Sequence, residues 1–261
     1  MRACGCFMVP AHATAVSPCL VTEAIGQLAA WIAMSDAKFQ RRPVAALAGE
    51  VRIVRAVAPG AVVDLTVDVD ECRRDAIAYH GTAQVGGDLV VELNQCVGPM
   101  LAMEEFDTPA QVRREFEVLC GDGRSGRMDW DDAIPPSSRS IIEHQPGRCL
   151  RANIEIPSEA PLFADHFPRK PVYPATLLLD AQIRLAIELA TDVVDPAAHE
   201  SLRPTRVRGV KVRSFVSPGQ IVEMAAEIVS AAPPGVELSL IASSAGRRIA
   251  TARLSVGQWE R

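Results

Sequence analysis

One histidine in this sequence stands in a segment that its neighbours should hold rigid. His166 is followed by Phe167 and Pro168, and two further prolines come at 171 and 174. Each proline fixes its own φ and disfavours regular structure, so the segment is expected to form a tight loop. An imidazole titrates near neutral pH, which suits a group that removes or returns a proton during a reaction. The sequence therefore offers His166 as a candidate general base.

A carboxylate follows this loop within a strongly apolar segment. After Pro174 the chain reads Ala-Thr-Leu-Leu-Leu-Asp-Ala-Gln-Ile-Arg-Leu. Proline suits the first turn of a helix, and apolar residues around most of the circumference are typical of a buried one, so a buried helix is expected over 175–190. Asp180 lies on its second turn. A carboxyl group in an apolar pocket can keep its proton at neutral pH, so an acid placed there can serve as a proton donor.

A second copy of this helix pattern occurs near the start of the chain. Residues 17–31 read Ser-Pro-Cys-Leu-Val-Thr-Glu-Ala-Ile-Gly-Gln-Leu-Ala-Ala-Trp, and Glu23 stands where Asp180 stands in the later copy, at an offset of 180 − 23 = 157. Apolar residues recur at helical spacing, which predicts another mostly buried helix over 18–34.

Turn signals repeat at nearly the same interval. Pro59-Gly60 returns as Pro218-Gly219, and Gly87 returns as Gly246, at the same offset of 218 − 59 = 246 − 87 = 159. The segments around these turns are rich in β-branched residues and predict strands. They cover 51–57, 62–69, 75–85 and 89–93 in the first copy, and 210–216, 221–229, 236–242 and 249–256 in the second. A fixed order of elements at a near-constant offset indicates an internal duplication.

The two copies differ at their beginnings. The second has two more expected strands, 138–144 and 149–156, before the histidine loop and Asp180. The first has only 22 residues before Glu23, so one or two strands are expected to be missing. Val9 falls where His166 sits, and His12 is nearby but out of register and lacks the Phe-Pro that follows His166.

The loop and helix together resemble the signature of the β-hydroxyacyl-(acyl carrier protein) dehydratases. That family has His-Phe-Pro, two further prolines, and Glu or Asp six residues after the last proline, a pattern met by His166-Phe167-Pro168, Pro171, Pro174 and Asp180. Glu23 and Gln27 fit the family's Glu-Ala-x-x-Gln pattern, whereas the second copy has Arg184 in place of the glutamine. Asp165, Arg169 and Ala175 replace three of the family's glycines.

The resemblance implies the hot-dog fold, in which an antiparallel sheet wraps one long helix. For this duplicated chain it predicts an α+β double hot-dog, with two long central helices wrapped by one continuous antiparallel sheet. We expect an N-terminal hot-dog over 1–97 that lacks the histidine loop, a linker over 98–137 with a short helix at 109–120, and a C-terminal hot-dog over 138–261.

The resemblance also implies the chemistry, which is dehydration of 3-hydroxyacyl thioesters to trans-2-enoyl thioesters. In the family the histidine of one unit faces the acid of the other, so the catalytic pair is expected to be His166 with Glu23. Asp180 would then be a structural or second-site acid. Pro18 stands where the family has a glycine N–H, and proline has none. The expected substrate-binding residues are Phe167, Pro168, Pro174, Ala175 and Cys19.

The implied partners are acyl carrier protein or coenzyme A, in fatty-acid or polyketide-type biosynthesis, and a homodimer of double hot-dogs is compatible with the family. Arg169, Lys170 and Arg213 belong to a locally basic part of an acidic chain. They are interpreted either as a dock for the acidic carrier or as an ordinary solvated face. Two alternatives stay open. One is a hot-dog thioesterase, which the histidine loop disfavours. The other is a non-catalytic carrier-binding or partner subunit, suggested by the shortened first copy and Pro18.

The composition argues against several other classes of function. A net charge of −5 argues against nucleic-acid binding, which usually needs a basic excess. No apolar run reaches the roughly 18 residues of a membrane-spanning helix, so no membrane partner is expected. The seven cysteines are odd in number and contain no Cys-x-x-Cys, which indicates reduced thiols in the cytoplasm and no metal site. No cofactor is implied.

Overall fold

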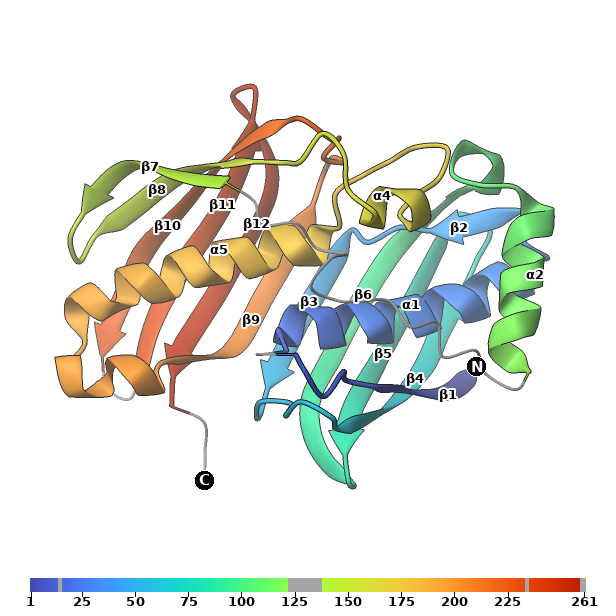
Figure 1. The fold of residues 1–261 in the computed structure, drawn as a ribbon, viewed down its shortest axis with the longest axis horizontal. Coiled ribbons are helices and arrows are strands. Elements are labelled where there is room, and N and C mark those ends of the chain that lie inside the picture. Colours follow the sequence, from blue (N-terminus) through green and yellow to red (C-terminus); the bar gives the residue numbers. More distant parts are fainter. Residues whose placement is uncertain (14–15, 122–137, 233–234, 259–261) are drawn as a thin grey trace.

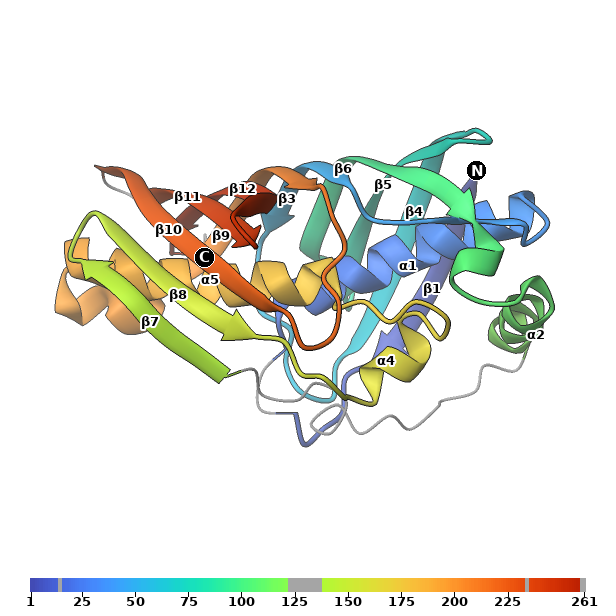
Figure 2. The ribbon, with the colours of Figure 1, turned by 90° about the horizontal axis from the view of Figure 1, so that it is seen from above.

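The computed structural model describes residues 1–13, 16–121, 138–232 and 235–258. In this part of the chain a single antiparallel sheet of twelve strands wraps two long helices (Figures 1 and 2). The strand order is β1-β4-β5-β6-β3-β9-β12-β11-β10-β8-β7, with β2 paired to β6. The predicted double hot-dog is confirmed.

The elements of the N-terminal half are β1 (Arg2–Met8), α1 (Pro18–Asp36), β2 (Arg41–Pro43), β3 (Leu47–Ile53), β4 (Val62–Cys72), β5 (Ala76–Val85), β6 (Asp88–Ala102), the 3₁₀ turn η1 (Met103–Glu105) and α2 (Pro109–Cys120). Those of the C-terminal half are β7 (Ser138–Gln145), β8 (Cys149–Glu155), α4 (Leu162–Asp165), α5 (Ala175–Ala190), η2 (Thr191–Val193), η3 (Pro196–Ser201), β9 (Arg203–Val212), β10 (Ile221–Ala232), β11 (Gly235–Ser244) and β12 (Arg247–Gly257).

The halves are joined where β3 pairs with β9. Leu47 lies opposite Lys211 and Arg52 lies opposite Arg206, in an antiparallel register. Because this pairing continues the hydrogen-bonded ladder, the sheet runs unbroken from one half into the other. The starts of α1 and α5 meet on the helix-covered side of this junction, where side chains of each helix bond to the other.

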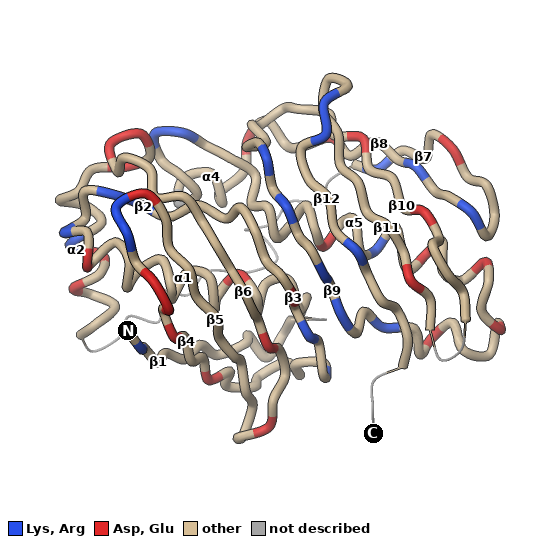
Figure 3. Tube along the Cα trace, turned by 180° about the vertical axis from the view of Figure 1, so that it is seen from behind, with Lys and Arg blue, Asp and Glu red and all other residues tan. Residues whose placement is uncertain are grey.

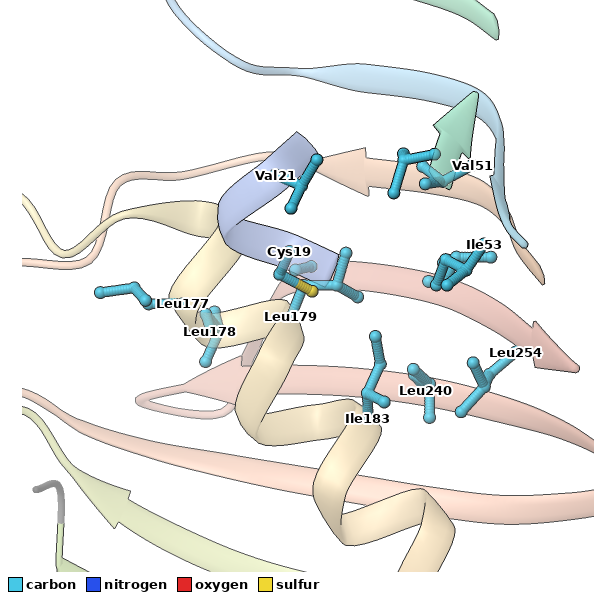
Figure 4. Close-up of a cluster of buried hydrophobic side chains, with 14 of the residues drawn as sticks. Cys19, Val21, Val51, Ile53, Leu177, Leu178, Leu179, Ile183, Leu240 and Leu254 are labelled. Carbon is cyan, nitrogen blue, oxygen red and sulfur yellow. The ribbon is translucent and has the colours of Figure 1, made fainter. Parts of the chain in front are cut away.

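Both central helices form for local reasons and are stabilised by burial. The Ser17 hydroxyl caps α1 by accepting a 3.1 Å hydrogen bond from the Cys19 N–H, and Pro18 occupies the first helical position. Buried side chains recur along α1 at helical spacing, and α5 is buried on most sides. Figure 4 shows the beginnings of the two helices packed with Val51, Ile53, Leu240 and Leu254 of the sheet. Each fully buried aliphatic side chain of this kind contributes about 1.5–3 kcal/mol.

Close approach of α1 to the sheet depends on a glycine in β5. A Cβ atom at Gly81 would lie 2.6 Å from Ile25 Cγ2 and 2.7 Å from the Thr66 carbonyl oxygen. The backbone oxygen cannot move away cheaply, so a larger residue at this position would push the helix off the sheet.

The predicted turns appear in both halves with matching backbone conformations. Gly60 has φ of +78° and Gly219 has +75°, and the hairpin pairs Gly86-Gly87 and Ala245-Gly246 all have positive φ. Two successive residues with positive φ are typical of the type I′ turns that join adjacent strands. The repeat seen in the sequence is therefore a repeat of structure.

Several strands differ in extent from the sequence expectations, most clearly β3, β9 and β6. β3 and β9 begin and end earlier than predicted, because Val57 and Val216 are buried in loops that fold back onto the core and are not strand residues. Buried positions favour β-branched residues in loops as well as in strands. Composition therefore placed both β3 and β9 too late in the sequence. β6 also continues to Ala102, five residues (102 − 97) beyond the predicted end of the first hot-dog.

The segment between the halves is described only in part. The short helix expected at 109–120 is α2, which the Thr108 hydroxyl caps by accepting a 3.2 Å hydrogen bond from the Gln111 N–H. Residues 98–105 of the expected linker belong to β6 and η1, and residues 122–137 lie outside the described residues.

The shortened N-terminal half lacks one strand and the histidine loop. β1 pairs with β4 as β8 pairs with β10, so within the described residues β7 is the outer strand without a counterpart. None of the helices described here is long and apolar enough to span a membrane.

Candidate functional site

A cavity of about 440 Å³ lies where the two halves meet. One face of α1 lines it with Glu23, Gly26, Gln27 and Trp31, and the N-terminus of α5 and the histidine loop close it from the other half. Glu23 and His166 both line this cavity, although they come from different copies of the repeat. The fold thus brings the histidine of one half to the same cavity as the acid of the other.

The histidine loop fixes the orientation of the His166 ring. Nδ1 lies 3.1 Å from the Val172 carbonyl oxygen, and the Val172 N–H donates to the His166 carbonyl at 3.1 Å. A carbonyl oxygen can only accept, so Nδ1 must carry the hydrogen. The lone pair of Nε2 is then available to take a proton, as a general base requires.

The loop is also anchored to the N-terminal half. The Phe167 ring packs edge-on against Phe106 with centroids 4.9 Å apart, and the Arg169 N–H donates to the Phe106 carbonyl at 3.0 Å. Phe167 in turn stacks on the His166 ring at 4.2 Å. The position of the C-terminal histidine is therefore set by a segment that follows the last strand of the N-terminal half.

Glu23 is held by two neutral groups. Thr176 Oγ1 on α5 donates to Glu23 Oε2 at 2.8 Å, and the Gln27 side-chain amide lies 3.2 Å from Oε1. A hydroxyl and an amide can each donate or accept. Both neighbours are therefore compatible with a carboxylate and with a protonated carboxyl group.

Asp180 has a different environment. It accepts hydrogen bonds from the Ser17 hydroxyl and from Arg184 Nε, the latter at 2.7 Å, and it is not among the residues that line the cavity. A guanidinium carries a positive charge and only donates, so it forms a charge-assisted pair with a carboxylate. Asp180 thus has the contacts of a structural ion pair.

The mirrored position in the N-terminal half offers no second histidine site. Val9 is buried with 2% exposure, and its N–H donates to the Ala61 carbonyl at 2.9 Å. His12 lies in an exposed turn, and neither residue lines the cavity.

Of the five expected substrate-binding residues, Phe167, Pro168 and Ala175 line the cavity, and Pro174 and Cys19 do not. Pro174 lies just outside it as the N-cap of α5. The Cys19 side chain is buried in the core, and its N–H donates to the Ser17 hydroxyl. Among the described residues no acceptor binds the N–H groups of Ala175 and Thr176, which lie at the start of α5 beside Glu23.

Sequence reasoning missed several polar residues of the cavity, among them Arg42, Tyr79 and Thr176. Burial lowers the pKa of Arg42, whose guanidinium lies 4.2 Å from the centre of the Phe167 ring. Thr176 could have been found from its place one residue after Ala175, at a helix start. The strand alternation of β5 could have placed Tyr79 on the helix-facing side. No sequence signal pointed to Arg42.

The basic residues fall into two groups. Figure 3 shows a run of Lys and Arg positions along β9. On this strand Arg206 pairs with Glu50 at 3.5 Å and Arg208 pairs with Glu237 at 2.9 Å, as expected of a solvated face. At the edge of the histidine loop, Lys170 pairs with Glu105 at 3.4 Å, and its ammonium also lies over the rings of Phe106 and Phe215. Arg169 donates to the Glu104 carbonyl and Arg213 to the Thr251 hydroxyl, both at 3.2 Å.

Comparison with known proteins gives matches to dehydratases in sequence and to hot-dog proteins in fold. Residues 142–251, from within β7 to within β12, match the family model described as ApeI-like, ApeI dehydratase. A 3-hydroxyacyl-(acyl-carrier-protein) dehydratase FabZ from Wolbachia pipientis is 26% identical over 117 residues, which are 44% of this chain and 80% of that protein. This chain is similar in sequence to FabZ-type dehydratases over part of its length. Other relatives of the same name are matched over 55–62% of their length.

Solved structures extend the likeness to the whole chain at the level of the fold. An acyl-ACP thioesterase from Bacteroides thetaiotaomicron superimposes with a TM-score of 0.60 at 10% identity, covering 98% of this chain and 97% of that one. A MaoC-like dehydratase gives a TM-score of 0.52 at 16% identity and covers 95% and 86%. At such identities the hot-dog fold is shared, and the similarity to FabZ-type dehydratases rests on the sequence matches.

Proposed function

We propose that this protein dehydrates 3-hydroxyacyl thioesters, carried by acyl carrier protein or coenzyme A, to trans-2-enoyl thioesters in fatty-acid or polyketide-type biosynthesis. The observation that carries the proposal is the shared cavity of His166 and Glu23. The sequence similarity to FabZ-type dehydratases supports the same reaction class.

In the proposed reaction His166 Nε2 removes a proton from carbon 2. Its Nδ1–H stays bound to the Val172 carbonyl, which keeps the ring oriented while Nε2 takes the proton. Glu23, protonated when the hydroxyacyl group binds, gives its proton to the hydroxyl on carbon 3. The C3–O bond breaks, water leaves, and the C2–H electrons form the C2=C3 double bond.

The thioester oxygen gains negative charge as the carbon 2 proton leaves. The free N–H groups of Ala175 and Thr176 are suited to stabilise it, because they lie at the positive end of the α5 dipole and line the cavity.

The proposal is tested by separating water loss from thioester hydrolysis. The full chain is incubated with 3-hydroxybutyryl and crotonyl thioesters of coenzyme A and of a carrier protein. Formation of the enoyl conjugate is followed by absorbance, and free thiol is measured in the same samples. We expect interconversion of the two thioesters without thiol release. Thiol release alone would identify a thioesterase, and neither reaction on any carrier would favour the non-catalytic subunit.

A further inference from the structure

A second polar position in the cavity lies one helical turn beyond Glu23. Tyr79 on β5 lines the cavity beneath α1, and its hydroxyl faces Gly26. A Cβ atom built on Gly26 would lie only 3.3 Å from the Tyr79 oxygen. Glycine therefore leaves open the space beside this hydroxyl. Because Gly26 is three residues after Glu23, this space is displaced about 4.5 Å along the helix from the proposed acid.

The surroundings of the Tyr79 hydroxyl offer it only a weak hydrogen-bond acceptor. Cys96 lies opposite Tyr79 in the β5–β6 pairing and also lines the cavity, and a thiol sulfur is a weak acceptor. Burial raises the pKa of Tyr79, so the phenol keeps its hydrogen and can donate. Its neighbours along the cavity wall, Ile77 and Leu93, are apolar and buried. Tyr79 is half-buried at the cavity wall, so its donor has a weak acceptor on the protein side and faces the cavity on the other, where an oxygen atom of a bound ligand could accept from it.

The position of Tyr79 indicates which part of a thioester it meets. Figure 2 shows α4, next to the histidine loop, on one side of α1, and β5 and β6 on the other. In the proposed reaction carbon 1 of the substrate lies at the start of α5 and carbon 3 lies at Glu23. The starts of α1 and α5 meet, so Gly26 and the Tyr79 hydroxyl, one turn beyond Glu23 on α1, lie further from the start of α5. They are therefore placed to meet the acyl chain beyond carbon 3.

We propose that Tyr79 and Gly26 form a hydrogen-bonding site for an oxygen atom on the acyl chain. The preferred substrates are then 3-hydroxyacyl thioesters with a second hydroxyl or keto group further along the chain. This inference rests on the proposed dehydration and names its substrate class.

The test compares two acyl groups on the same thiol. Dehydration of a 3-hydroxyoctanoyl thioester of N-acetylcysteamine is measured beside that of analogues with a second hydroxyl at carbon 5, 6 or 7. We expect the parent protein to have a higher kcat/KM for at least one dihydroxy substrate. Tyr79→Phe should lower that preference roughly 3- to 10-fold, the range of one neutral hydrogen bond, and leave the monohydroxy substrate nearly unchanged.

The chain's only other tyrosine provides a matched control. Tyr173 lines the same cavity beside the histidine loop, and Tyr173→Phe should change both substrates by the same factor. Gly26→Ala gives a second variant that favours the helix and fills the space beside the Tyr79 hydroxyl. It should also reduce the preference for the second oxygen.

Two results would overturn the inference. One is a parent protein that dehydrates the monohydroxy chain and shows no preference for any dihydroxy chain. The other is a Tyr79→Phe variant that slows both substrates equally, which would place the hydroxyl against the thioester or the thiol arm. If the parent dehydrates neither substrate, the proposed function itself fails, and that outcome is distinguishable from both.

Discussion

Thr176 and Glu23 join the two halves of the molecule, with Thr176 Oγ1 donating to Glu23 Oε2 over 2.8 Å between the two central helices. A mirrored bond runs from the Ser17 hydroxyl to Asp180. Each acid is thus held by a hydroxyl from the start of the opposite helix. The surroundings of the two acids differ one helical turn further on, where Gln27 bonds to Glu23 and Arg184 bonds to Asp180. Gln27 and Arg184 are separated by the same offset as the two acids.

The first prediction separates the two acids. His166→Ala and Glu23→Gln should each lower dehydration of a 3-hydroxyacyl thioester by about 10²–10⁴-fold, the usual cost of losing a positioned acid or base. Asp180→Asn should cost much less in rate, and its main effect should be on stability because it breaks the ion pair with Arg184. The three variants are assayed together after their melting temperatures are measured. An inactive Asp180→Asn beside an active Glu23→Gln would reverse the assignment.

A second prediction concerns variants in which Gln27, beside Glu23, and Arg184, beside Asp180, are replaced by each other's residue type. Gln27→Arg places a donor-only guanidinium beside Glu23 and should favour its ionised form, so activity should fall at least tenfold although Glu23 is intact. The matched variant, Arg184→Gln, should leave the rate within about twofold because Asp180 is outside the cavity. Measuring kcat and KM for both separates lost proton transfer from blocked binding. Equal losses in the two variants would contradict the proposed asymmetry.

The third prediction concerns the carrier. Charge reversal at Arg169, Lys170 and Arg213 should raise KM for carrier-linked substrate and spare a small N-acetylcysteamine thioester. The effect should be larger at low salt, since salt screens exposed charges. Reversal of Arg206 and Arg208 on β9 is the control and should change neither KM. If the triple variant and the control variant have the same kinetics, Arg169, Lys170 and Arg213 are ordinary solvated residues and do not bind the carrier.

A fourth prediction follows from the buried phenol of Tyr173. Burial, with a further contribution from the negative charge of Asp180, raises the pKa of Tyr173 to about 12. An unfolded tyrosine titrates near pH 10. Between these values the native state binds one more proton than the unfolded chain, so the unfolding free energy should fall as pH rises, by about 1.4 kcal/mol per pH unit for this group.

Tyr173→Phe removes this titration and should flatten the dependence of the unfolding free energy on pH between about 10 and 12. Urea denaturation at a series of pH values measures the difference between the variant and the parent. Parallel curves for the two proteins would show that Tyr173 is not protected in the native state.

The fifth prediction uses the cysteines. Burial raises the pKa of Cys96 to about 12, and burial followed by the charge of Asp180 raises the pKa of Cys19. The thiolate is the reactive form, so both should resist iodoacetamide at neutral pH, whereas the exposed Cys4, Cys6 and Cys120 should be modified. Mass spectrometry before and after unfolding locates the labels. Rapid labelling of Cys96 in the folded protein would mean that the sheet opens there.

The sequence by itself determined the local features of this protein. Prolines and the apolar run placed α5 at 175–190 as observed, and the paired glycines marked both hairpins at equivalent positions of the two copies. These signals are local, because φ restriction, capping and helical periodicity act over a few neighbouring residues. The duplication and the family resemblance then led to the double hot-dog.

Only the tertiary structure decided which polar groups meet. Across the helix pair, Thr176 bonds to Glu23 and Ser17 bonds to Asp180. Cys19 is buried in the core, whereas Tyr79 and Arg42 line the cavity. These contacts join residues as far as 163 positions apart, and they depend on the distance between packed helices and on the β3–β9 junction. No pattern along the chain encodes such distances, because they result from burying both helices against one shared sheet.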